Sequence, residues 1–332
     1  MKLVTYESGR QLRTGVVEGK NVVDVRAAID LIRARRGPRG LYGESKFKTG
    51  AALLTESGAA PRDMIALLGH EDAWLKALGV VARGLAKELG GAKSGKSSTA
   101  GAKGVVAPLA SVRLRAPIPR PGKITCVGLN YADHAKEQGE PLPASPIFFL
   151  KSSNTIAGPG DAIQLPPNSV QNDYEAEFAV VIGKGGRRIP EEMAWEHVAG
   201  YMLVNDVTAR DMQTGDRQWF RGKSCDTFAP TGPWIVTKDE VPDPHNLRIS
   251  LTLNGATMQD SSTANLIFKV PFLVSHLSQS LTWEPGDIIS TGTPPGVGVS
   301  RKPQVFLKAG DTVSVTVERL GTLTNTVIGP DE

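Results

Sequence analysis

The stretch that decides the fold is DYEAEFAVVIG at residues 173–183, followed by AGYMLVNDVTARDMQ at residues 199–213. The apolar residues of the first run are β-branched or aromatic, and Gly183 closes the run, which predicts a strand. Side chains alternate between the faces of a strand, so Glu175 and Glu177 lie on one side. The second run ends at Asn205 and Asp206 and predicts a third carboxylate at the end of another strand.

Three carboxylates in an enclosed site repel one another and ionise with difficulty unless a cation is present. Mg²⁺ is the expected ion, with Mn²⁺ or Ca²⁺ as alternatives, because hard divalent cations prefer oxygen ligands. A second interpretation is that Glu175 and Glu177 occupy a solvated strand face and Asp206 caps a turn. This stretch by itself leaves both interpretations open.

Length and composition indicate a globular protein with a substantial core. The chain has 332 residues, of which 40% are hydrophobic and 22% charged. We expect a cytoplasmic protein that does not enter the membrane, because no apolar run reaches the roughly 18–20 residues that span a bilayer and no signal peptide is evident. The two cysteines, Cys126 and Cys225, predict neither a disulfide framework nor a zinc site.

The charge is distributed unevenly along the chain. Residues 1–120 hold 21 basic and 10 acidic residues, against 17 and 24 in the remainder. The basic residues of the first part are scattered and fit no nucleic-acid-binding motif, so we expect a solvated surface and no nucleic-acid partner.

Two domains are expected, a small N-terminal α/β domain at 1–112 and a β-rich domain at 113–332. The first begins with hairpin-like strands at 2–6 and 14–24, then helices at 24–36 and 61–89, the second broken near Gly69. The Gly/Ser/Lys-rich run 90–104 reads as a flexible linker, and the segment 40–110 has no assignable function. Residues 90–97 match the nucleotide-binding P-loop pattern, but a helix precedes them instead of a strand, which argues against one.

Short apolar runs separated by Pro and Gly predict that the second domain is a β-sandwich or barrel. Two helices interrupt it, at 190–197 and from Asn265, with Pro271 in a first turn. The runs begin at residues 123, 146, 177, 201, 233, 247, 287 and 311.

Several polar residues stand where they could act together. His134 and Glu137 are three apart, so one helical turn places them on one face, as a base and its orienting carboxylate require; a surface pair is the alternative. Lys223 could stabilise negative charge on a substrate. Arg210, Gln213 and Thr293 are candidate donors near the carboxylates.

The order of these motifs resembles the fumarylacetoacetate hydrolase superfamily over about residues 113–329. The matching motifs are NYADHAKE at 130–137, EAEF at 175–178, NDVTARDMQ at 205–213, GKSCDTF at 222–228 and EPGDIISTGTPPGVG at 284–298. The resemblance implies a mainly β (α+β) fold with peripheral helices, a mixed β-roll or sandwich, and a homodimer. The additional metal-binding aspartate of fumarylacetoacetate hydrolase proper has no equivalent in residues 127–130, so the chain is closer to the shorter members.

The resemblance also assigns roles to residues. It implies Glu175, Glu177 and Asp206 as metal ligands and His134 and Glu137 as a catalytic pair on a lid. Catalytic Lys223 and the substrate-binding residues Lys151 (near the mouth of the site), Arg210, Gln213 and Thr293 complete the implied site.

The reaction expected first is metal-dependent hydrolysis of a C–C bond in 2,4-dioxo acids of the acylpyruvate or fumarylpyruvate type, through an enolate stabilised by the metal. The alternative is a decarboxylase, tautomerase or isomerase of 2-oxo acids, such as oxaloacetate or a hydroxymuconate derivative. A non-catalytic 2-oxo acid binding protein is the third possibility. The motifs are shared by all these members and do not choose among them.

Overall fold

The computed structural model describes residues 1–34, 45–56, 58–90 and 104–330. The chain forms two compact units, Met1–Leu114 and Arg115–Glu332. The expected linker and the P-loop-like run lie outside the described residues, apart from Gly90 and Gly104. No described helix is both long and apolar enough to cross a membrane.

The N-terminal unit contains an antiparallel sheet in the order β4-β3-β2-β1. Its strands are β1 (Lys2–Ser8), β2 (Gln11–Glu18), β3 (Asn21–Asp24) and β4 (Val106–Pro108). The expected single strand at 14–24 is therefore wrong. It is divided by a turn at Gly19, whose φ of 59° lies in the left-handed region that glycine adopts at little cost.

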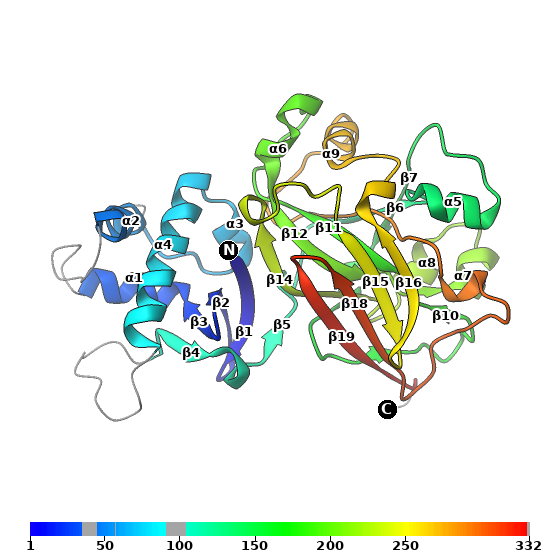
Figure 1. Cartoon of the computed structure of the whole chain (residues 1–332), viewed down its shortest axis with the longest axis horizontal. Helices are drawn as coiled ribbons and strands as arrows, with labels where there is room; N and C mark the ends of the chain where they lie inside the picture. The colour runs from blue at the N-terminus through cyan, green and yellow to red at the C-terminus, as the bar shows by residue number, and fades with distance from the viewer. Residues whose placement is uncertain (35–44, 57, 91–103, 331–332) are drawn as a thin grey trace. The chain divides into compact units, whose positions relative to one another are not determined.

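Four helices belong to this unit (Figure 1): α1 (Val25–Ala34), α2 (Ser45–Glu56), α3 (Met64–Leu68) and α4 (Asp72–Leu89). The expected break near Gly69 is confirmed, because α3 ends before it. Helix α4 buries Trp74, Leu78, Val81 and Leu85, the spacing of one helical face, and contacts β2, β3 and β4.

The C-terminal unit is a sandwich of two sheets, which confirms the expected α+β fold. Its first sheet has the order β14-β12-β11-β17-β6-β7, with β8 (Ile156–Ala157) parallel to β14. The strands are β6 (Ile124–Gly128), β7 (Ile147–Lys151), β11 (Ala176–Ile182), β12 (Val198–Asn205), β14 (Ala229–Thr237) and β17 (Ile288–Ser290).

The second sheet has the order β16-β15-β18-β19-β9 and covers β11 and β12 (Figure 1). Its strands are β15 (Arg248–Leu253), β16 (Ala256–Ser262), β18 (Thr312–Val317), β19 (Gly321–Ile328) and β9 (Ile163–Gln164). Phe178 and Val180 of β11 pack in the core shared with Leu251 and Val315. The other face of β11 is therefore left for Glu177.

Short helices and a two-stranded ribbon complete this unit. The helices are α5 (Ala132–Gln138), α6 (Ala194–His197), α7 (Arg210–Gly215), α8 (Phe220–Lys223) and α9 (Val270–Ser278). The expected helix with Pro271 in its first turn is confirmed by α9, but it begins at Val270 and not at Asn265. The ribbon pairs β10 (Asn172–Asp173) with β13 (Thr208–Ala209), and β5 (Leu114–Arg115) contains the sequence boundary between the two units.

Candidate active site

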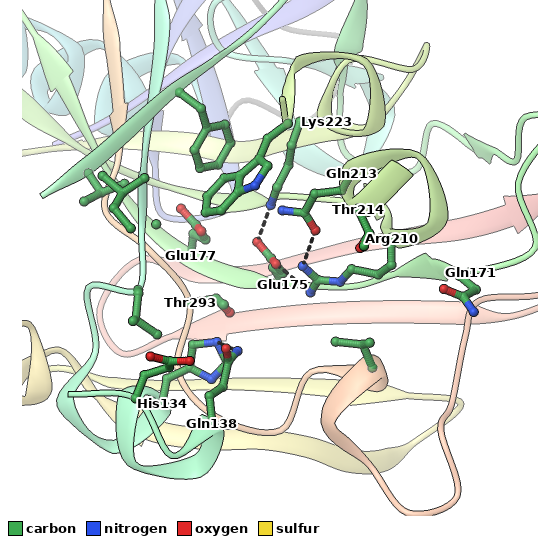
Figure 2. Close-up of a pocket in the computed structure, with 18 of the residues that line it drawn as sticks. His134, Gln138, Gln171, Glu175, Glu177, Arg210, Gln213, Thr214, Lys223 and Thr293 are labelled. Atoms are coloured by element: carbon green, nitrogen blue, oxygen red, sulfur yellow. Dashed lines mark hydrogen bonds and ion pairs between the residues drawn. The ribbon is translucent and has the colours of Figure 1, made fainter. Parts of the chain in front are cut away.

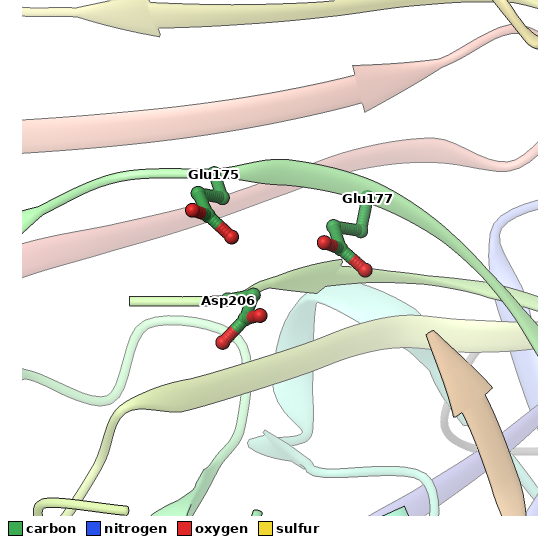
Figure 3. Close-up of side chains that lie close together, drawn as sticks. All are labelled: Glu175, Glu177 and Asp206. Carbon is green, nitrogen blue, oxygen red and sulfur yellow. The ribbon is translucent and has the colours of Figure 1, made fainter. Parts of the chain in front are cut away.

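Three buried carboxylates meet where β11 begins and β12 ends (Figure 3). The strands pair Ala176 with Asn205, so Glu175 and Asp206 are opposite each other just beyond this pair. The amide N–H of Asp206 donates to the carbonyl of Glu175 over 2.9 Å. One carboxylate oxygen from each of Glu175, Glu177 and Asp206 lies within 4.8 Å of the other two. Alternation along β11 and the register of β12 thus bring together the three residues that the sequence singled out.

Two of these carboxylates are held by cations. Lys223 Nζ lies 2.8 Å from Glu175 Oε2 and 2.8 Å from Asp206 Oδ2, and Lys151 Nζ lies 2.5 Å from Asp206 Oδ1. Arg210 Nη2 lies 2.7 Å from Glu175 Oε1. Burial favours the neutral acid, but Lys223 and Arg210 outweigh it and lower the pKa of Glu175 to about 2. Glu175 is therefore ionised at neutral pH.

Glu177 differs from its neighbours because it forms no ion pair within the described ranges. Its Oε2 accepts hydrogen bonds from Ser290 Oγ at 2.5 Å and from the amide N–H of Gly292 at 3.0 Å. Burial, reinforced by the charges of Asp206 and Glu175, raises the pKa of Glu177 well above its usual range. A cation at this point would restore the ionised form.

The donor set fits a hard divalent cation. All three groups are carboxylates, their side chains are buried, and the least compensated of them, Glu177, faces the other two. Oxygen ligands in this number are those that Mg²⁺ or Mn²⁺ takes, whereas a zinc site would draw on histidine or cysteine. The arrangement supports a site for a divalent metal ion.

His134 and Glu137 form a hydrogen-bonded pair on α5. His134 Nδ1 lies 2.9 Å from Glu137 Oε2, and its Nε2 lies 2.9 Å from the side-chain amide of Gln138. Glu137 also accepts from the amide N–H of Gly296 through its other oxygen, at 2.9 Å. A carboxylate at Nδ1 favours the tautomer with the proton on that nitrogen, which leaves Nε2 as the base.

One cavity of about 620 Å³ is lined by Glu175 and Glu177 of the carboxylate cluster and by His134 of this pair. Figure 2 shows Lys223, Gln213 and Arg210 on one side of Glu175 and His134 with Gln138 on the other. Of the residues predicted from the sequence, the walls include His134, Glu175, Glu177, Arg210, Gln213, Lys223 and Thr293. A buried metal-type site and a base thus face the same space.

Lys151 is not where the resemblance placed it. The lysine was expected near the mouth of the site, but it does not line the cavity, and its side chain has no exposed surface. Its ammonium group instead pairs with Asp206 and donates to the carbonyl of Val207 at 3.1 Å. Its position at the end of β7 and its buried side chain make Lys151 the partner of a carboxylate, and its role in substrate binding stays a prediction.

Arg210 and Gln213 are one helical turn apart on α7 and hold each other in place. Arg210 Nε donates to Asp173 Oδ2 at 2.8 Å, and its Nη1 donates to Gln213 Oε1 at 3.1 Å. Because the carbonyl oxygen of Gln213 is occupied, its amide NH₂ is the end left to donate into the cavity.

Three residues that position this site were not predicted from the sequence. Asp173 accepts from Arg210 and from the amide N–H groups of Gly298 and Val299, and Gln138 contacts the histidine. Gln259 donates to Thr293 Oγ1 and accepts from the amide N–H of Ala176, both at 2.8 Å. Asp173 and Gln138 stand beside motif residues, a signal that could have found them. Gln259 lies outside every motif.

Comparison with known proteins gives a consistent result. Residues 123–328 match the family described as fumarylacetoacetate (FAA) hydrolase C-terminal. The chain is 48% identical over 270 residues to the mitochondrial oxaloacetate tautomerase FAHD2A of Bos taurus, which covers 81% of this chain and 80% of that protein.

Solved structures of similar proteins cover nearly the whole chain. A fumarylacetoacetate hydrolase from the psychrophile Exiguobacterium antarcticum has a TM-score of 0.75 and 33% identity, with 99% of each chain covered. A maleylpyruvate hydrolase from Sphingobium sp. SYK-6, in complex with manganese (II) ion and pyruvate, has a TM-score of 0.68 and 28% identity, again over 99% of each chain.

Proposed function

Because the chain belongs to the fumarylacetoacetate hydrolase family, we propose that it is a metal-dependent enzyme that interconverts the keto and enol forms of 2-oxo acids of the oxaloacetate type. One observation carries the proposal: Glu175 and Glu177 of the buried carboxylate cluster line the same cavity as His134, whose Nδ1 is held by Glu137. The similarity to an oxaloacetate tautomerase over four fifths of both chains supports this reaction better than the hydrolysis expected first.

Tautomerisation needs a base and a group that accepts negative charge. The C3–H bond of the substrate breaks, a C2–C3 double bond forms, and the 2-oxo oxygen gains a proton. A divalent ion on Glu175, Glu177 and Asp206 would supply Lewis acidity for the 2-oxo and carboxylate oxygens. The protein groups described above have to move the proton and stabilise the charge.

His134 is the group placed to take the proton. Glu137 holds its Nδ1 and so orients the ring, which leaves Nε2 to receive the proton from C3. In the structure Nε2 contacts Gln138, so the Gln138 side chain must turn away when substrate is bound. Removal of a proton by a positioned histidine contributes about 10²–10⁴-fold to a rate.

Lys223 and Gln213 are placed to offset the negative charge. Lys223 is buried, and the carboxylates of Asp206 and Glu175 outweigh the effect of burial and raise the pKa of its ammonium group, which keeps it positive. Its Nζ also lies 4.8 Å from the ring centroid of Phe149. The amide of Gln213 adds a neutral donor, and fixed donors of this kind stabilise developing charge most where water is excluded.

C–C hydrolysis of 2,4-dioxo acids is the second candidate. The same histidine, held by Glu137, can activate a water molecule in place of C3–H, and the chain is similar over 99% of its length to a maleylpyruvate hydrolase. The two reactions share the metal site and the base. They differ in whether water is consumed and a second acid is released.

The test is a reaction panel with metal-free protein to which Mg²⁺ or Mn²⁺ is added. Enol oxaloacetate is followed by ultraviolet absorbance and by exchange of the C3 protons in D₂O, and acetylpyruvate and fumarylpyruvate are followed by mass of the products. The blanks are metal without protein and metal with His134→Ala, because metal ions alone promote enolisation. Faster tautomerisation than both blanks, abolished by EDTA, supports the proposal. Release of pyruvate from the dioxo acids without tautomerisation would establish the second candidate.

A further inference from the structure

Among the residues that the structure describes, the cavity wall has one positive charge without a partner. Its basic residues within the described ranges are Arg210, Arg217 and Lys223. Arg210 is paired with Asp173 and Glu175, and Lys223 with Glu175 and Asp206. The guanidinium of Arg217, by contrast, makes no hydrogen bond or ion pair with any described residue. It is the cation of the wall whose charge is left for a ligand.

The position of Arg217 separates it from the metal-type site. It lies on the exposed segment between α7 and α8, whereas Glu175 and Glu177 are buried. The same cavity therefore runs from a buried cluster of carboxylates to a solvent-exposed guanidinium. A molecule that spans it meets an oxygen-rich, cation-binding end and a positively charged end.

The backbone at Arg217 is also costly for this residue. Its φ of 59° lies in the left-handed region, where a residue with a Cβ loses about 1–2 kcal/mol relative to the usual conformation. Glycine would avoid this cost, so the side chain at this position is not there for local stability.

We propose that Arg217 binds the second, distal carboxylate of a dicarboxylic 2-oxo acid whose 2-oxo carboxylate end occupies the metal site. The inference rests on the proposed function and makes it more specific, because it separates dicarboxylic from monocarboxylic 2-oxo acids. A guanidinium presents two parallel N–H groups that match the two oxygens of a carboxylate. Arg217 is thus a specificity-determining residue.

The opposing charge at the mouth is Glu140, which is exposed and also lines the cavity. No hydrogen bond or ion pair joins its side chain to Arg217 among the described residues. It would repel a distal carboxylate that strays from the arginine. Removing the charge of Glu140 and removing the charge of Arg217 should therefore have opposite effects on the binding of the same substrate. This gives a second test of the proposal.

The test compares a substrate and an inhibitor that differ only in the distal group. Oxaloacetate carries the second carboxylate, and pyruvate, measured as a competitive inhibitor, lacks it. Arg217→Gly, which suits the backbone at this position, should raise KM for oxaloacetate by about 10- to 30-fold, the size of a charge-assisted hydrogen bond at an exposed site. Both kcat and the inhibition constant of pyruvate should stay the same, and Arg217→Lys should recover part of the loss.

The matched control is Arg188→Gly. Arg188 is exposed, has a φ of 54° and is not part of the cavity wall, so its replacement should leave both constants unchanged. Glu140→Gln should lower KM for oxaloacetate. The proposal is overturned if Arg217→Gly weakens pyruvate as much as oxaloacetate, if it weakens neither, or if Glu140→Gln reproduces its loss. If the proposed function itself is wrong, the result is different, because neither the unmodified protein nor any variant would then turn over oxaloacetate.

Discussion

The amide N–H of Gly296 donates to Oε1 of Glu137 over 2.9 Å and so ties helix α5 to a loop 159 residues later in the chain. The other oxygen of this carboxylate holds His134. The orientation of the proposed base therefore depends on a backbone group that belongs to a different part of the fold.

The first prediction concerns this contact. Gly296 has a φ of 102°, and an added Cβ would overlap the carbonyl oxygen of Met258, so Gly296→Ala should displace the loop and its amide. Strain of this kind costs about 1–3 kcal/mol. We expect a lower melting temperature for Gly296→Ala. Its kcat, measured at a temperature at which both proteins are folded, should be well below that of the unmodified protein.

Gly310→Ala is the control, because Gly310 has a φ of 91° and no atom within 4 Å of the added Cβ. Equal kcat values for the two variants would contradict the role of the contact.

The second prediction separates the base from the metal site. His134→Ala removes the proposed base but leaves Glu175, Glu177 and Asp206 intact, so turnover should fall by about 10²–10⁴-fold while metal affinity is kept. Calorimetric titration with Mn²⁺ and the tautomerase assay measure the two quantities on the same preparation. Near-full activity of this variant would show that another group moves the proton.

The third prediction concerns Glu177→Gln. The raised pKa of Glu177 means that its ionised form destabilises the folded protein at neutral pH when no cation is present. The amide keeps an acceptor for Ser290 and removes the charge, so the metal-free variant should melt at the same temperature or higher. Its affinity for Mn²⁺ should fall strongly, because a ligand is lost. Glu192→Gln, at an exposed position, should change neither. An unchanged Mn²⁺ affinity for Glu177→Gln would exclude it as a ligand.

The fourth prediction concerns the buried pair of Lys151 and Asp206. Lys151→Met leaves a buried carboxylate with less compensation, and breaking such a pair costs about 3–5 kcal/mol. The loss of stability should be smaller in saturating Mg²⁺, since the ion supplies positive charge at the same carboxylate. Urea unfolding with and without Mg²⁺ measures the difference. Lys184→Met breaks an exposed pair with Glu196 and should have little effect under either condition. A deficit that is the same with and without Mg²⁺ would argue against a metal at Asp206.

The fifth prediction is a pH dependence. Burial raises the pKa of Asp211, but hydrogen bonds from Ser169 Oγ and from the amide N–H groups of Val170 and Met212 outweigh it, and the net shift is downward from 3.8. A lowered pKa stabilises the folded state above the unfolded value, and this contribution disappears as the pH falls below about 4. The free energy of unfolding lost in Asp211→Asn should therefore be constant from about pH 5 to about pH 7. It should become smaller as the pH falls below about 4. Urea unfolding at a series of pH values tests this, and a loss that persists unchanged in acid would contradict it.

Much of the secondary structure of the C-terminal unit could be predicted from local sequence patterns. The strands β6, β7, β11, β12, β14, β15, β17 and β18 all fall on the short apolar runs noted in the sequence. Two-residue alternation placed Glu175 and Glu177 on one face, and three-residue spacing placed His134 beside Glu137. These relations depend only on neighbours in the chain, which is why they can be read without the fold.

The reaction that the protein catalyses could not be predicted from these local patterns. The motifs are common to hydrolases and tautomerases of the family, and the sequence-based choice of a hydrolase has less support from the relatives than the alternative. What distinguishes the reactions is the shape and charge of the cavity around the substrate. Arg217, which helps to form that cavity, lies in no motif of the sequence, and the only signal for Gln138 is its place beside one.

The sequence by itself determined which carboxylates share a face and which histidine has a carboxylate partner. Only the tertiary structure decided that Lys151 is buried against Asp206, that Gln259 bridges Ala176 and Thr293, and that Gly296 holds Glu137. The physical reason is the range of the interactions. Periodicity is set within a few residues, whereas these contacts join segments brought together by the packing of two sheets around one core.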